Sequence, residues 1–133
     1  MAAVCADLGT VAGPRSLVAA AGGRQIDIIV NNAGVAAGQD LASITIENFE
    51  WQYNINVRGP LLLVQAALPF LPTDRSGRIV NVSSMSSAMG LAGQSIYGGT
   101  KAALEAMTRT WARELSERAT VNTINPGPVD TRM

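Results

Sequence analysis

Short runs of β-branched residues alternate along the chain with long helical patterns, and this alternation constrains the fold more than any other feature. Runs of this kind, each closed by Asn, Ser or Pro-Gly turn residues, cover residues 26–30, 78–82 and 120–124. Apolar residues at helical spacing cover residues 11–21, 46–71 and 97–118. Strands that alternate with helices of this length imply crossover units and a parallel sheet, because a parallel return needs a connection long enough to cross the sheet. The sequence therefore predicts a single α/β domain with a parallel sheet buried on both faces.

Two further features refine this prediction. The apolar residues 3–6 read as the remainder of a fourth strand. The longest helical pattern carries Gly59 and Pro60 in its interior, where proline removes a backbone donor and clashes with the preceding turn. We therefore expect a kink near Asn56.

Composition removes several classes of function. The 133 residues include no histidine and one cysteine, Cys5, which excludes His-dependent triads, His/Cys zinc clusters and disulfide frameworks. Ten basic residues balance ten acidic ones, so we expect neither a nucleic-acid partner nor a polybasic membrane anchor. The longest apolar stretch, residues 61–71, is interrupted by Gln65 and Pro69 and is too short to cross a bilayer. We expect a soluble, cytoplasmic domain.

One tyrosine and the only lysine stand at a spacing that suits proton transfer. Lys101 follows Tyr97 by four residues within a helical pattern, so both side chains are expected on one helix face. An ammonium beside the phenol would favour the phenolate and lower a pKa that is ordinarily near 10. The alternative is an exposed pair in which the tyrosine ring only packs.

Hydroxyl and amide side chains follow two of the predicted strands. Ser84 comes just after residues 78–82, and Asn31-Asn32-Ala33-Gly34 closes residues 26–30. The carboxyl ends of parallel strands and the amino ends of the following helices share one edge of the sheet. Ser84 and Tyr97 are therefore expected to converge there, where two hydroxyls could hold one carbonyl oxygen. Plain Ser-rich and Asn-rich turns are the alternative.

Taken in order, these residues resemble the short-chain dehydrogenase/reductase family. The resemblance covers nearly the whole chain and rests on Asp7, Asn31-Asn32-Ala33-Gly34, Asn56 in Asn-Val-Arg-Gly, Ser84, Tyr97 with Lys101, and Asn125-Pro126-Gly127 followed by Thr131. It implies a Rossmann-like, doubly wound parallel sheet and reversible hydride transfer between a nicotinamide cofactor and a carbonyl or secondary alcohol.

The resemblance also implies catalytic roles. Tyr97 would be the acid/base, and Lys101 would lower its pKa and bind the nicotinamide ribose. Ser84 would orient the substrate oxygen, and Asn56 would hold a water of the proton relay.

Further residues would bind the cofactor, together with Tyr97 and Lys101. Asp7 would contact adenine, while Asn31, Ala33 and Gly34 would line the cofactor. Pro126 and Gly127 would shape the last loop, from which Val129 and Thr131 would meet the nicotinamide carboxamide. A habit of the family's reductases favours NADP(H), with NAD as the alternative.

The chain departs from the family pattern at both ends. A glycine-rich turn after a complete strand is missing, as are the family's first two strands and its final strand. We therefore expect a partial Rossmann-like sheet truncated at both ends, and an apolar strand edge left open.

Two functions follow from the sequence. The first is an NAD(P)-dependent oxidoreductase acting on a small-molecule ketone or alcohol. Residues 85–94 carry no charge, which favours a 3-oxoacyl, polyketide-type or steroid-like substrate over a phosphorylated one. The second is a non-catalytic module that pairs with other chains through the helices over 46–71 and 97–118. The same helices are expected to form a homo-oligomer of the enzyme.

Overall fold

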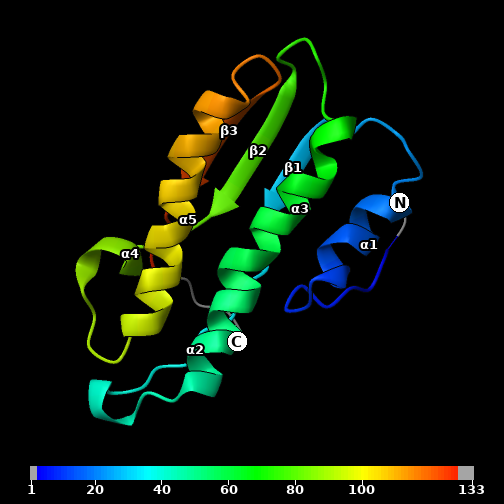
Figure 1. Cartoon of the computed structure of the whole chain (residues 1–133). Helices are drawn as coiled ribbons and strands as arrows, with labels where there is room; N and C mark the ends of the chain where they lie inside the picture. The colour runs from blue at the N-terminus through cyan, green and yellow to red at the C-terminus, as the bar shows by residue number, and fades with distance from the viewer. Residues whose placement is uncertain (1–2, 129–133) are drawn as a thin grey trace.

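A three-stranded parallel sheet lies behind a layer of helices in the computed structural model, which describes residues 3–128 (Figure 1). The strands, in their order across the sheet, are β1 (Ile28–Asn31), β2 (Gly77–Val82) and β3 (Ala119–Ile124). The α-helices are α1 (Ala12–Ala20), α2 (Ile46–Tyr53), α3 (Gly59–Ala67), α4 (Ser86–Met89) and α5 (Ser95–Glu114). Both neighbouring strand pairs are parallel, which confirms the α/β fold expected from the sequence.

One face of the sheet is buried and the other is open. Ile29, Ile79 and Val121 stand in register across the three strands, and each is at most 6% exposed. Ile28 and Val30 point to the opposite face, where they are 65% and 57% exposed. The expectation that the strands are buried on both faces is therefore wrong for residues 3–128, because the helices described there pack on a single face.

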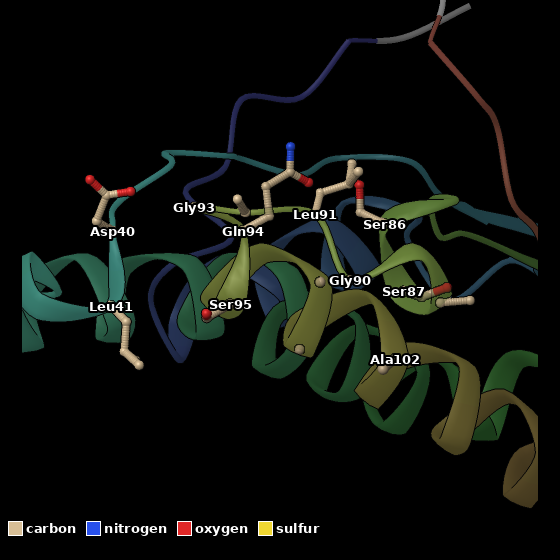
Figure 2. Close-up of a pocket in the computed structure, with 14 residues that line it drawn as sticks. Asp40, Leu41, Ser86, Ser87, Gly90, Leu91, Gly93, Gln94, Ser95 and Ala102 are labelled. Carbon is tan, nitrogen blue, oxygen red and sulfur yellow. The ribbon is translucent and has the colours of Figure 1, made fainter.

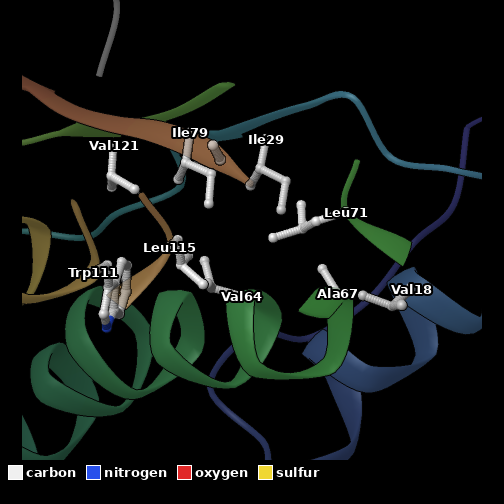
Figure 3. Packing of buried hydrophobic residues seen from close by; sticks show 10 residues of the cluster. Val18, Ile29, Val64, Ala67, Leu71, Ile79, Trp111, Leu115 and Val121 are labelled. Atoms are coloured by element: carbon white, nitrogen blue, oxygen red, sulfur yellow. The ribbon is translucent and has the colours of Figure 1, made fainter. Parts of the chain in front are cut away.

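The core lies between the sheet and two neighbouring helices. Figure 3 shows side chains of α3 and α5 facing the strand residues Ile29, Ile79 and Val121, and Val18 of α1 closing one side. The buried helix residues include Val64, Ala67 and Trp111, and Leu115, just after α5, is buried beside them. This packing holds α5 against β2 and β3, so its first turn lies at the carboxyl edge of the sheet.

The longest helical pattern is broken where proline predicts it. Residues 46–71 form α2, a π-helical turn (Asn54–Arg58), α3 and a short 3₁₀ turn (Leu68–Phe70). Pro60 stands in the first turn of α3, directly after the π-helical turn, and has no N–H to continue the helical ladder. The kink expected near Asn56 thus takes the form of a π-helical turn.

Two segments differ most from the ranges expected from the sequence. Residues 3–6 form no strand, because among the described strands β1 pairs only with β2 and leaves this segment without a ladder partner. The last helix ends at Glu114 rather than at Arg118. The backbone of Leu115 leaves the helical region, and its side chain enters the core.

Candidate active site

Three loops meet the amino end of α5 at the carboxyl edge of the sheet. They follow β1 (residues 32–40), β2 (residues 83–85) and β3 (residues 125–128). The loops after β2 and β3 are joined directly, because the Met85 N–H donates to the Pro126 carbonyl at 3.2 Å. The candidate residues therefore lie on one edge, as parallel topology requires.

Lys101 and Tyr97 lie together on α5. The Lys101 ammonium sits 5.6 Å from the centroid of the Tyr97 ring and donates to the Val82 carbonyl at 2.8 Å. Lys101 is 4% exposed, and burial lowers the pKa of its ammonium. The end of β2 therefore fixes a cation next to the phenol.

The buried ammonium predicts how stability changes with pH. Burial sets the pKa of Lys101 in the folded chain below its unfolded value, near 10.4, so the unfolded chain holds more protons between the two values. Stability contributed by this group therefore rises with pH through that alkaline window. We expect Lys101→Met to lack this rise, so that the wild type gains stability relative to the variant as the pH rises toward the unfolded pKa of lysine. Urea unfolding of both chains across pH 7–10 measures the difference, and a constant difference would contradict the assignment.

Asn56 ties the loop after β1 to α5. Its amide oxygen accepts from the Val35 N–H at 2.8 Å, and its nitrogen donates to the Val35 carbonyl at 2.8 Å and to the Thr100 hydroxyl at 3.1 Å. The residue is 1% exposed. Its side chain thus holds the loop in place, and its role toward a relay water stays a prediction.

Gly34 lies beside both Asn56 and Lys101. A Cβ at this position would stand 3.3 Å from the Lys101 ammonium and 3.4 Å from the Asn56 amide oxygen. Glycine therefore leaves the approach to the ammonium open, while Ala33 and Gly34 themselves are exposed at the edge.

Ser84 is held in the turn that begins α4. Its hydroxyl oxygen accepts from the Ser86 N–H at 3.2 Å and lies 3.3 Å from the Ser86 hydroxyl, to which it donates. The Ser87 hydroxyl donates to the Ser84 carbonyl at 2.8 Å. These contacts fix the half-buried Ser84 hydroxyl at the end of β2.

Asn31 is buried beneath the edge. Its amide nitrogen donates to the Asn81 side chain at 2.7 Å, and Asn81 in turn donates to the Thr108 hydroxyl of α5 at 2.7 Å. This polar chain joins β1, β2 and α5 within the core. The Asn31 side chain is therefore engaged in the core, and the expected contact of Asn31 with a cofactor would be made by its backbone.

A cavity of about 630 Å³ lies between the segment 86–95 and the first turns of α5 (Figure 2). Its lining includes the polar side chains Asp40, Ser86, Ser87, Gln94 and Ser95. Ser84 and Tyr97 are not among the lining residues, but the Ser84 hydroxyl lies 3.3 Å from the hydroxyl of the lining residue Ser86, and the lining residue Gly98 follows Tyr97 along the chain. The cavity thus adjoins the Ser84 hydroxyl.

A family model described as short chain dehydrogenase matches residues 1–133. The chain belongs to this family. Its ordered motif set agrees with that membership, as does the meeting of Ser84, Lys101 and the loop after β1 at one sheet edge.

Two similar family members are fungal reductases. The chain is 61% identical to an L-xylo-3-hexulose reductase of Hypocrea jecorina over 109 residues, which cover 78% of the chain and 36% of the relative. It is 59% identical to an L-xylulose reductase of Aspergillus niger over 111 residues, which cover 78% of the chain and 37% of that relative. The chain thus spans little more than a third of these relatives.

A solved structure extends the likeness to three dimensions. A blue fluorescent protein from a metagenomic library, crystallised in complex with NADPH, superposes with a TM-score of 0.90 at 39% identity. The match covers 96% of this chain and 53% of that one. The described fold is therefore part of a Rossmann fold of the short-chain dehydrogenase family.

The remaining candidates for cofactor contact lie at the two ends of the described chain. The Asp7 carboxylate accepts from the Gly9 N–H at 2.8 Å and closes the turn before α1. Pro126 and Gly127 follow β3, and a Cβ on Gly127 would stand 2.7 Å from the Met85 sulfur. Val129 and Thr131 lie outside the described residues.

Sequence reasoning missed two residues that support this edge. The Thr100 hydroxyl accepts a hydrogen bond from the Asn56 amide nitrogen and donates one to the Tyr97 carbonyl at 2.7 Å. Glu105 accepts from the Ser83 hydroxyl at 2.7 Å. The available signal was helical spacing, since Glu105 follows Lys101 by four residues on the same face of α5.

Proposed function

We propose that the chain carries the catalytic part of an NADP(H)-dependent reductase that converts the keto group of an open-chain sugar to a secondary alcohol. The observation that carries the proposal is the Lys101 ammonium held between the Tyr97 ring and the Val82 carbonyl. A buried cation beside a phenol suits a proton donor to a carbonyl oxygen.

Each catalytic group has a task in this proposal. When bound, NADP(H) supplies hydride to the carbonyl carbon. Tyr97 donates its proton to the carbonyl oxygen, and Lys101 stabilises the negative charge that the tyrosine oxygen then carries. The Ser84 hydroxyl donates to the same carbonyl oxygen and orients it.

The exposed edge fits the nicotinamide half of the cofactor. Gly34 leaves open the space that a Cβ would fill next to the Lys101 ammonium, so a ribose hydroxyl could reach that donor. Ala33, Gly34, Pro126 and Gly127 would lie along this half. We assign NADP(H) as the preferred cofactor, with NAD as the alternative.

The two fungal relatives support a sugar substrate, because their names identify the ketoses L-xylo-3-hexulose and L-xylulose. The adjoining cavity offers hydroxyl and amide groups, including those of Ser86, Ser87 and Gln94, that could bind the hydroxyls of such a sugar. A 3-oxoacyl or polyketide-type ketone is the second candidate, favoured by residues 85–94, which lack a charged side chain.

The substrate test compares two ketones on the 133-residue chain. NADPH binding is first measured by fluorescence titration, with NADH as the control. NADPH oxidation is then followed with L-xylulose and with an acetoacetyl thioester. We expect saturable NADPH binding and faster oxidation with L-xylulose. Turnover of the thioester alone would overturn the substrate class, and a folded chain that binds neither nucleotide would favour the non-catalytic interaction module.

We propose further that the helices over residues 46–71 and 97–118 pair with a second copy of the chain. Phe49, Trp51 and Leu61 are exposed on α2 and α3, and such apolar side chains suit a subunit interface.

In residues 3–128, no helix combines the length and apolar character that a bilayer crossing needs. A cytoplasmic location stays a prediction.

A further inference from the structure

One carboxylate oxygen connects the loops that follow β2 and β3. The Glu105 Oε1 atom accepts from the Ser83 hydroxyl at 2.7 Å and from the Asn125 amide at 2.6 Å. Glu105 itself lies on α5, one helical turn beyond Lys101. Three elements therefore meet at a single acceptor atom.

The two connected loops carry groups of the proposed site. Ser83 directly precedes Ser84, which would orient the substrate oxygen, and Asn125 directly precedes Pro126 and Gly127, which would lie along the nicotinamide. Backbone bonds also cross here, since the Ser83 N–H donates to the Ile124 carbonyl at 2.8 Å. The distance between substrate and cofactor groups thus depends on how these loops are held together.

We propose that Glu105 is a positioning residue that fixes the substrate-orienting loop at Ser84 and the nicotinamide loop at Asn125 relative to each other. The proposal rests on the proposed reductase function. Glu105 touches neither reacting group and acts through the side chains that donate to it, of which Ser83 and Asn125 share its Oε1 atom.

The surroundings of Glu105 keep its carboxyl deprotonated, so Oε1 has no proton of its own and serves as an acceptor. Burial acts to raise the pKa of this carboxyl, but hydrogen bonding with Ser87, Ser83 and Asn125 outweighs it and lowers the pKa below the usual range. The carboxylate is therefore ionised at neutral pH and can accept both donors.

The geometry makes a specific prediction about substitutions. Both donors reach the same oxygen, so Glu105→Gln keeps an acceptor at that position, whereas Glu105→Ala removes it. Loss of one to two hydrogen bonds should speed local opening of the loops by about tenfold. Glu114→Ala, the same change at an exposed position of α5, is the matched control.

The experiment measures amide hydrogen exchange residue by residue by NMR on the cofactor-free chain, together with its affinity for NADPH. The Met85 N–H reports on the loops because it donates to the Pro126 carbonyl. We expect faster exchange at Met85 and weaker NADPH binding in Glu105→Ala, and wild-type values in Glu105→Gln and Glu114→Ala. Should Glu105→Ala not fold, Asn125→Ala removes one donor from the exposed loop and should also speed exchange at Met85.

The two readouts separate the proposals. Unchanged exchange at Met85 in Glu105→Ala, or failure of Glu105→Gln to restore it, overturns the positioning role of Glu105. A wild-type chain that protects Met85 but binds no NADPH overturns the proposed reductase instead. Equal global unfolding of Glu105→Ala and the wild type shows that the faster exchange at Met85 is local.

Discussion

Tyr97→Phe is expected to lower the rate of ketone reduction by about 100- to 10,000-fold, which is the usual contribution of a general acid. Phenylalanine keeps the ring that lies 5.6 Å from the Lys101 ammonium, so packing on α5 is retained and only the proton donor is lost. NADPH affinity should change little. The measurement is the rate of NADPH oxidation with a saturating ketone, alongside a fluorescence titration of both chains.

The other tyrosine of the chain provides the matched control. Tyr53 stacks on Phe49 with ring centroids 4.4 Å apart, and its hydroxyl faces Gly99, two residues beyond Tyr97 on α5. Tyr53→Phe should leave the rate of reduction near the wild-type value. If Tyr97→Phe retained wild-type turnover, or if both variants lost it equally, Tyr97 could not be the proton donor.

The alternation of runs and helical patterns was sufficient to predict the layers of the fold. Each of the three β-branched runs contributes to a strand of a parallel sheet, because the connecting helices are long enough for the crossover that a parallel return needs. The β-branched runs did not predict that only one face of the sheet is buried. Ile28 and Val30 are as apolar as Ile29, and only the placement of the helices decides which of them is covered.

The candidate site divides along similar lines. The meeting of Ser84, Tyr97 and the loop after β1 at one edge follows from parallel topology, and Lys101 beside Tyr97 follows from helical spacing. The partners of the amide side chains do not follow from sequence. Asn31 bonds to Asn81, which is 50 positions away, and only the register of the strands brings the two together.

The interruption of the helix before Pro60 shows that a sequence rule can predict where a helix is disturbed but not which conformation the backbone adopts there. Proline at position 60 predicts a break near Asn56 because it removes a donor from the helical ladder. Whether the chain bends or widens there depends on its neighbours. Gly59 approaches the Leu8 carbonyl so closely that a Cβ would stand 3.0 Å from it, and Asn56 is bonded to the loop after β1. The turn observed there, Asn54–Arg58, is π-helical and lies directly before Gly59.

Ile79→Ala should cost about 2–5 kcal/mol in the free energy of unfolding, the range measured for deleting a large buried aliphatic side chain. Ile79 is 0% exposed and stands at the centre of the buried row, between Ile29 and Val121. Its neighbours belong to a packed core that cannot close fully over the space left behind. Urea unfolding followed by circular dichroism measures the loss as a shift of the midpoint at constant slope.

The open face of the same sheet supplies the control and sharpens the test. Ile28→Ala removes the same side-chain atoms at a site that is 65% exposed, so it should change stability by less than about 0.5 kcal/mol. The contrast depends on the helices covering one face only. If a further segment or a second copy of the chain covers the open face in solution, Ile28→Ala will cost as much as Ile79→Ala. Equal losses would therefore contradict one-sided burial, whereas a large difference would establish that the row through Ile79 carries the core.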